Sequence, residues 1–315
     1  MLTRCKFFLL SFSLAWILPA TIPAQPAASF KVTTDESLWR EQLATWRAQR
    51  EKQIAAPDGW LTLSGLEWLN PGVNSIGAAS DNRIVLRLKV PDHIGLITVS
   101  GQTVQLLSPT GGFPSDLTID GRPAREGPLV VDNVTPSTIA WHGITMVVLN
   151  RSGRFVLRIK DADSASRKAF HGLNWYPPDP NFSVKAKWIP FARPHTEKIP
   201  TVIGATLDLP APGIAEFSLG GKTFRLEPVM EDPSGKTLFF ILRDATSTTR
   251  TYGGGRFLYS GLPDHGLAAP GSLILDFNRL ENPPCAYTNY ATCPLPPEQN
   301  RLQVALEAGE QRYTQ

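Results

Sequence analysis

Residues 215–226 read AEFSLGGKTFRL, and this stretch decides the fold class. Two strand-like segments, Ala215 to Leu219 and Thr223 to Leu226, flank the pair Gly220-Gly221. Two adjacent glycines suit the positive φ angles of a tight primed turn, so the stretch predicts an antiparallel β-hairpin. It is not a phosphate-binding loop, although Lys222-Thr223 matches the end of one. Position 216 is Glu rather than Gly, and the segment lies between two predicted strands rather than before a helix.

The same pattern of short runs and turns continues along the chain. Ser100-Gly101 and His142-Gly143 each separate two runs rich in Val, Ile, Thr and aromatic residues, which predicts two further hairpins. The predicted strands around these turns are Leu96–Val99, Thr103–Leu107, Thr138–Trp141 and Ile144–Leu149. The 28 prolines and 25 glycines also fit short strands joined by turns. We therefore expect a mainly β fold, with antiparallel hairpins forming a β-sandwich or barrel-like body.

Isolated strands complete this prediction. In the last of them Leu302, Val304 and Leu306 alternate with polar or small residues, which favours a strand over a helix. The isolated strands are Trp60–Leu63, Glu67–Leu69, Ile84–Leu86, Phe155–Ile159, Leu238–Leu242, Leu273–Phe277 and Leu302–Glu307.

One amphipathic helix is predicted before the strands. Thr33 and Glu36 have the spacing of a capping box, and Pro57-Asp58-Gly59 ends the helix. An apolar stripe of Trp39, Leu43 and Trp46 is expected to pack against the body rather than to bind a ligand. The opposite face carries the charged residues Arg40, Glu41, Arg47, Arg50 and Glu51.

Residues 1–24 have the three parts of a cleavable signal peptide. Arg4 and Lys6 are basic, residues 7–18 (FFLLSFSLAWIL) are apolar, and residues 19–24 end in small side chains. A membrane-spanning helix needs about 20 residues, so this run is short for an uncleaved anchor. A buried core helix is the other alternative. We expect cleavage after Ala24, and a periplasmic or secreted mature chain of residues 25–315 with no stable membrane span.

Composition limits the partners of the mature chain. The sequence is 42% hydrophobic and 19% charged, which is typical of a globular protein and not of a disordered one. Without Arg4 and Lys6, 29 of the 31 basic residues remain against 28 acidic residues, so the net charge is +1. A broad nucleic-acid-binding surface is not expected at that charge.

Prolines cluster between residues 175 and 200. This stretch predicts either a seam between two tightly packed halves or an ordered loop within one domain, and the sequence leaves both open. Its prolines are Pro177, Pro178, Pro180, Pro190, Pro194 and Pro200.

Familiar catalytic and cofactor motifs are missing. The sequence has no G-x-S-x-G and no H-E-x-x-H, and Gly253-Gly254-Gly255 lacks the third glycine of a dinucleotide-binding fingerprint. Its five histidines, at positions 93, 142, 171, 195 and 265, are far apart, so no zinc site can be read from their spacing. We therefore expect no cofactor and no metal.

Polar residues and both mature cysteines gather near the C-terminus. The string DFNRLENPPCAYTNYATCPLPPEQNRLQVALEAGE, residues 276–310, resembles the C-terminal signature of DUF1684, a prokaryotic family of unknown function. Residues 59–66, 158–161, 170–177 and 251–258 also resemble the family pattern. The chain departs from N-R-A-Y-N-P-P at Leu280-Glu281. The resemblance implies no established activity.

Three interpretations of this segment stay open. In the first, Cys285 and Cys293 form a disulfide bond, as paired thiols tend to do outside the cytoplasm. Buried ion pairs then fix the loop, made by Arg256, Asp276, Arg279 and Glu307. In the second, the two thiolates join His265 or His171 in a metal or redox site.

In the third interpretation the same polar residues line a pocket. Asp276 with Glu307 or Glu310 would supply a general acid and base. Arg256 and Arg279 would hold an anionic substrate through bidentate hydrogen bonds. Asn278, Asn300 and Trp175 are further candidates for ligand binding.

The sequence thus predicts an exported β-rich protein that is either a ligand-binding or structural module, or a hydrolase-like enzyme built around Asp276. Its expected partner is a small molecule or a component of the cell envelope.

Overall fold

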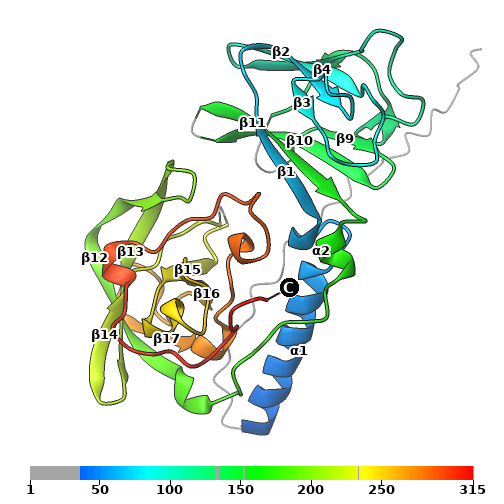
Figure 1. The fold of residues 1–315 in the computed structure, drawn as a ribbon. Coiled ribbons are helices and arrows are strands. Elements are labelled where there is room, and N and C mark those ends of the chain that lie inside the picture. Colours follow the sequence, from blue (N-terminus) through cyan, green and yellow to red (C-terminus); the bar gives the residue numbers. More distant parts are fainter. Residues whose placement is uncertain (1–35, 132–134, 152, 233, 315) are drawn as a thin grey trace, which may run out of the picture.

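The computed structural model describes residues 36–131, 135–151, 153–232 and 234–314 (Figure 1). The predicted signal peptide and Thr33 of the predicted capping box lie outside these ranges. Within them strands predominate, which confirms the expected mainly β fold. Nearly all strand pairs are antiparallel, as predicted. The pair of β2 (Gly72–Gly77) with β3 (Ile84–Val85) is parallel. The four described sheets are open, so the barrel-like alternative does not apply to this part of the chain.

Two sheets form the N-terminal β unit, shown in blue, cyan and green in Figure 1. One has the order β1-β11-β10-β9-β6-β7 and the other the order β3-β2-β4-β5-β8. Side chains of both sheets share one core, in which Ile97 and Met146 are fully buried. The remaining strands are β1 (Leu63–Trp68), β4 (Gly95–Ser100), β5 (Thr103–Leu107), β6 (Thr118–Ile119), β7 (Arg122–Pro123), β8 (Gly127–Pro128), β9 (Thr138–Trp141), β10 (Ile144–Arg151) and β11 (Arg154–Asp161).

Two further sheets form the C-terminal β unit. One has the order β14-β13-β12-β17, and the other pairs β15 with β16. Trp188 and Phe240 are fully buried in the core that the two sheets share. The strands are β12 (Ser183–Pro200), β13 (Thr206–Leu219), β14 (Lys222–Leu226), β15 (Thr237–Leu242), β16 (Arg256–Gly261) and β17 (Gly271–Asp276).

All three predicted hairpins are confirmed. In the hairpin of β13 and β14, Leu219 pairs with Lys222 and the two turn residues have φ angles of 56° and 74°. Positive φ at both central positions is what a type I′ turn requires, which explains the two glycines. The hairpin of β9 with β10 turns at His142-Gly143 as predicted. In the hairpin of β4 with β5, Ser100 pairs with Thr103, so the turn is Gly101-Gln102 instead of Ser100-Gly101.

For the proline-rich stretch the sequence left a seam and an ordered loop open. Much of the stretch is instead a strand. From Ser183 it forms β12, which pairs with β13 on one side and β17 on the other. The register with β13 shifts between Pro190 and His195. Proline has no N–H to donate to a neighbouring strand, and a bulge is a position where none is needed.

Two other predicted strands differ from the structure. Trp60–Thr62 is a 3-10 helix, η1, and β1 begins only at Leu63. Residues 302–307 form irregular chain, although Leu302 and Leu306 are buried and Gln303 and Glu307 are exposed as the alternation predicts. Alternation reports which side chains face the core, and it does not require a neighbouring strand.

The helix α1 (Glu36–Ile54) lies along the C-terminal β unit, and the C-terminus ends beside it (Figure 1). Its apolar stripe packs as predicted: Leu43 is fully buried, and the Trp46 ring meets the Trp175 ring edge-on at 5.6 Å. A short helix, α2 (Ala165–Lys168), follows β11. The helix α1 therefore brings the N-terminal part of the sequence against the polar C-terminal segment.

Candidate functional site

On the face of α1 opposite the apolar stripe, Arg47, Arg50 and Glu51 are partly buried. The guanidinium of Arg47 lies 4.7 Å from the centre of the Trp175 ring. A carboxylate oxygen of Glu51 accepts hydrogen bonds from Trp175 Nε1 at 3.0 Å and from the Leu173 N–H at 3.1 Å. Trp175 thus anchors the segment after α2 to the helix.

Arg50 is the centre of a buried polar network. Its Nε donates to Glu310 at 3.0 Å, its Nη2 donates to the Asn282 carbonyl at 2.9 Å, and Glu281 lies 3.4 Å away. Burial opposes the charge of Arg50, but Glu281 and Glu310 raise its pKa. The other oxygen of Glu310 accepts from the Asn282 N–H at 2.8 Å and from the Tyr287 hydroxyl. Both carboxylate oxygens of Glu310 are therefore engaged.

Asp276 is also buried and engaged. One oxygen accepts from Trp39 Nε1 at 3.0 Å and lies 3.4 Å from Arg279 Nε. The other accepts from the backbone N–H and the side-chain amide of Asn278, at 3.2 and 3.0 Å. Arg279 also lies over the Trp46 ring at 5.5 Å. Asp276, Asn278 and Arg279 thus form one local cluster, which contacts α1 through Trp39 and Trp46.

Arg256 is fully buried, as expected if buried ion pairs fix the C-terminal loop. Its partner, Asp244, was not among the residues predicted from the sequence. Its Nη2 pairs with Asp244 at 2.8 Å, and the same guanidinium donates to the carbonyls of Leu306, Ala308 and Glu310. The partner Asp244 caps η3 (Ala245–Thr248). Arg256 therefore fixes the irregular C-terminal segment from inside rather than facing a substrate.

Cys285 and Cys293 lie at disulfide distance, with Cα atoms 6.1 Å apart, which is within the usual range for such bonds. Within the described ranges, neither cysteine joins His265 or His171 in a group of three or more metal-ligating side chains. His265 instead contacts the Pro270 carbonyl at 3.0 Å.

Glu307 differs from the other candidates because it is exposed, which corrects its expected place in a buried ion pair. It pairs with Arg250 at 2.7 Å, and the two side chains are 52% and 59% exposed. Both line a pocket of about 370 Å³, here named the Arg250 pocket. The pocket is formed by Tyr176, Pro177, Asp179, Phe182, Arg250, Glu307 and Gln311.

Buried contacts fix the walls of the Arg250 pocket. The Tyr176 N–H donates to the Gly309 carbonyl at 3.0 Å, and the Gln311 N–H donates to the Asn174 carbonyl at 2.8 Å. The Asn278 side chain accepts from the Asp179 N–H at 2.9 Å and donates to its carbonyl at 2.8 Å. Asn278, a predicted ligand-binding residue, therefore positions a pocket residue instead of lining the pocket.

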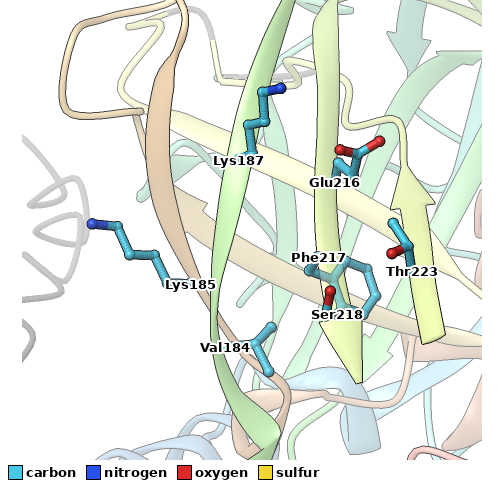
Figure 2. Close-up of a pocket in the computed structure, with 7 residues that line it drawn as sticks. All are labelled: Val184, Lys185, Lys187, Glu216, Phe217, Ser218 and Thr223. Atoms are coloured by element: carbon cyan, nitrogen blue, oxygen red, sulfur yellow. The ribbon is translucent and has the colours of Figure 1, made fainter. Parts of the chain in front are cut away.

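Figure 2 shows another hollow, of about 480 Å³, on β12, β13 and β14. Lys187 and Glu216 are partners in the strand register, and Glu216 is paired with Arg225 at 2.7 Å. Lys185 extends away from the other labelled side chains. The residues of this hollow come from three neighbouring strands of one sheet. The Arg250 pocket instead brings together segments that are far apart in sequence. The hollow is lined by Val184, Lys185, Lys187, Glu216, Phe217, Ser218 and Thr223.

Another cluster joins three side chains that the sequence does not connect. His195, Glu197 and Glu227 place one ligand atom each within 4.8 Å of one another. The spacing of His195 and Glu197 on one strand puts both on the same face, but nothing in the sequence connects them with Glu227. Asn300, another predicted ligand-binding residue, holds the backbone of Glu227 through its N–H and its carbonyl, both at 2.8 Å.

Residues 168–311, which contain the Arg250 pocket and the partners of Arg50 in the buried network, match the family described as "Protein of unknown function (DUF1684)". The chain belongs to the DUF1684 family. Three resembling stretches, 170–177, 251–258 and 276–310, lie within the matched residues, whereas 59–66 and 158–161 lie outside them. DUF1684 thus covers the C-terminal β unit and its closing segment.

The DUF1684 chain is also similar to an uncharacterized protein of Haloarcula marismortui whose solution NMR structure is known. The two share 32% sequence identity over 46% of this chain and 78% of the other, with a TM-score of 0.40. No curated protein matches this DUF1684 chain. Among its described helices, none has the length and apolar character needed to cross a membrane.

Proposed function

We propose that this protein is an exported binding module for a small polar molecule that carries a carboxylate, and that the molecule binds in the Arg250 pocket. One observation carries the proposal: among the described residues, the ion pair of Arg250 in that pocket is with an exposed partner, Glu307, while the Tyr176 ring lies 6.0 Å from the guanidinium. Exposed ion pairs contribute about 0–1 kcal/mol. A ligand carboxylate can therefore replace Glu307 on Arg250 at little cost.

The rest of the pocket supports recognition of a small molecule. Pro177, Phe182 and the Tyr176 ring give it apolar walls, and its volume of about 370 Å³ lies in the range of small-molecule sites. The Tyr176 hydroxyl is buried and has no hydrogen-bond partner among the described residues. Burial raises the pKa of Tyr176, so the hydroxyl keeps its proton and can donate. A small shift of the ring would bring that donor to a bound anion.

Asp179 and Gln311 provide polar groups for the rest of the ligand. Asp179 is held by Asn278 and caps η2 (Pro180–Phe182) by accepting from the Asn181 N–H at 2.9 Å. A carboxylate beside an arginine suits a ligand that has an amino or hydroxyl group as well as a carboxylate. Amino acids and hydroxy acids are the simplest molecules of this class.

The hydrolase alternative has less support in this geometry. A general acid and base must reach the substrate, but both oxygens of Glu310 and both oxygens of Asp276 are engaged inside the protein. Glu307 is accessible, but it is paired with Arg250 at 2.7 Å, and the other carboxylate of the pocket, Asp179, caps η2. Binding therefore fits the pocket better than carboxylate catalysis does.

Export is supported by two features of the sequence and structure. Residues 1–24 have the pattern of a signal peptide, and Cys285 and Cys293 lie at disulfide distance. A periplasmic or secreted location would give the binding module access to small molecules outside the cytoplasm.

The proposal is tested by screening the twenty amino acids, small hydroxy acids and dicarboxylic acids for an increase in melting temperature. Calorimetric titration of each active compound then gives its Kd. Arg250→Ala should weaken binding about tenfold or more, because a hydrogen bond to a charged group is worth about 1.5–3 kcal/mol. Glu307→Gln should tighten binding, because it removes a competing negative charge.

Arg225→Ala is the matched control, since Arg225 is an exposed arginine on β14 outside the pocket. It should leave the Kd unchanged. If no compound of these classes binds, or if Arg250→Ala binds as tightly as the unmodified protein, the proposed function is wrong.

A further inference from the structure

His195, Glu197 and Glu227 form a cluster that shares no residue with the Arg250 pocket. His195 Nε2 lies 3.3 Å from a carboxylate oxygen of Glu197 and 3.0 Å from one of Glu227. Ligands that surround one zinc ion tetrahedrally, at about 2.0–2.2 Å each, lie roughly 3.4 Å from one another. The two distances from His195 are therefore close to that spacing, and all three ligand atoms lie within 4.8 Å of one another.

The strand positions explain why the three side chains meet. The bulge of β12 ends at His195, where pairing with β13 resumes opposite Ala211. Bulges turn a strand and redirect its side chains. Glu197 is two residues further along and shares the same face, while Glu227 directly follows β14. The fold thus brings two ligands from β12 to one from the neighbouring hairpin.

Outer contacts hold the ligands in place. The 3-10 helix η6 (Glu298–Asn300) supports two of them: Gln299 Nε2 donates to Glu197 at 3.2 Å, and Asn300 fixes the Glu227 backbone. The Phe191 ring lies 4.9 Å from the His195 ring. Such supporting contacts orient metal ligands and commonly contribute 10-fold to 100-fold to affinity.

The electrostatics of the cluster favour a cation. Glu197 and Glu227 place two carboxylates beside one imidazole, and their side chains are 21% and 12% exposed. The Glu227 oxygen nearest His195 is buried without a full hydrogen bond among the described residues. Two neighbouring carboxylates that repel each other are stabilised by a shared positive ion.

We propose that His195, Glu197 and Glu227 bind one divalent transition-metal ion, with Zn²⁺ as the preferred species. The set of one imidazole and two carboxylates suits Zn²⁺, and three protein ligands leave a coordination position for water. His195 is 45% exposed, so the ion can enter from solvent. Zn²⁺ would bind the unprotonated Nε2 of His195, with the ring N–H on Nδ1.

Titration of the purified, metal-free protein with ZnCl₂ in a calorimeter tests the site. One Zn²⁺ per chain should bind, and His195→Ala and Glu227→Gln should each weaken binding tenfold or more. Gln299→Ala should weaken it severalfold, because it releases Glu197. His265→Ala is the matched control, since His265 is an exposed histidine beside Asp264 but outside the cluster. It should leave Zn²⁺ affinity unchanged.

Nitrogen-15 NMR of the histidine rings separates a loss of ligands from a loss of folding. One equivalent of Zn²⁺ should shift the ring-nitrogen signals of His195 in the unmodified protein and leave those of His265 in place. The proposal is overturned if Zn²⁺ does not bind stoichiometrically, if His195→Ala retains the affinity, or if the His195 signals do not move. None of these measurements depends on a ligand in the Arg250 pocket, so the two proposals fail independently.

Discussion

Arg50 in α1 and Glu310 near the C-terminus form a buried ion pair, although 260 residues separate them in the sequence. The Nε–Oε1 distance is 3.0 Å, and the Glu310 side chain is fully buried. Glu310 also accepts from Tyr287 and from the backbone of Asn282. The pair therefore joins the helix to the segment that closes the C-terminal β unit.

Removal of one partner of this pair should be strongly destabilising. Glu310→Gln leaves Arg50 buried with less compensation, and breaking a buried pair in this way costs about 3–5 kcal/mol. The free energy of unfolding, measured by urea denaturation with tryptophan fluorescence, should fall by that amount.

Arg225→Gln is the control for that measurement. It breaks the shorter but exposed pair of Arg225 with Glu216, at 2.7 Å, and should cost at most about 1 kcal/mol. Equal losses in the two variants would contradict a special role for the buried network.

Glu281 should make stability depend on pH. Burial raises its pKa from 4.5 to about 7, although Arg50 lies 3.4 Å away and acts in the opposite direction. A carboxyl with a higher pKa in the folded chain than in the unfolded chain favours the folded state in its protonated form. This contribution is complete below pH 4.5 and is lost as the pH rises through 7.

We expect the free energy of unfolding to decrease by up to about 3 kcal/mol between pH 4.5 and 8, relative to the same change in Glu281→Gln. Urea denaturation of both proteins across this range measures the difference. Parallel pH profiles would show that Glu281 titrates normally. Glu281 occupies one of the two positions at which the chain departs from the pattern N-R-A-Y-N-P-P, so this pH dependence would be a property of this chain.

Local signals in the sequence were sufficient for much of the fold. Turn glycines and serines located the three hairpins, and the spacing of Trp39, Leu43 and Trp46 identified the packing stripe of α1. The prolines of β12 were misleading, because proline disfavours a strand in general but is tolerated at a bulge. The alternation in residues 302–307 reported burial correctly and strand pairing incorrectly.

The site was less predictable because its partners are distant in sequence. Asp276 and Glu310 were recognised as important polar residues, but nothing local indicated that Arg50 or Trp39 would reach them from α1. In the same way, no local signal in the sequence indicated that His195 and Glu227 would meet. Charged residues on a helix are exposed in most proteins, and nothing in the sequence separates the partly buried Arg50 from the exposed Arg40. Only the tertiary fold distinguishes the two outcomes.

Gly255 should not tolerate a side chain. Its φ angle is 95°, and a Cβ would lie 2.5 Å from the Leu242 carbonyl oxygen and 2.5 Å from a ring carbon of Pro296. Gly255→Ala should therefore lower the free energy of unfolding by about 2–4 kcal/mol. Gly253→Ala is the control, because a Cβ there would meet its nearest neighbour, the Ser247 carbonyl oxygen, at 3.6 Å. That change should be neutral or slightly stabilising, and equal effects would contradict the steric argument.

Cys285 and Cys293 should be oxidised in the mature protein. Thiol titration of the denatured mature chain should find no free thiol before reduction and two afterwards, with no metal bound to these cysteines. Closing so short a loop stabilises a protein by about 2–3 kcal/mol in the chain-entropy model, so the double variant Cys285→Ser/Cys293→Ser should unfold more easily by that amount. Two free thiols before reduction would contradict the disulfide. They would also reopen the interpretation in which the two thiolates belong to a metal or redox site.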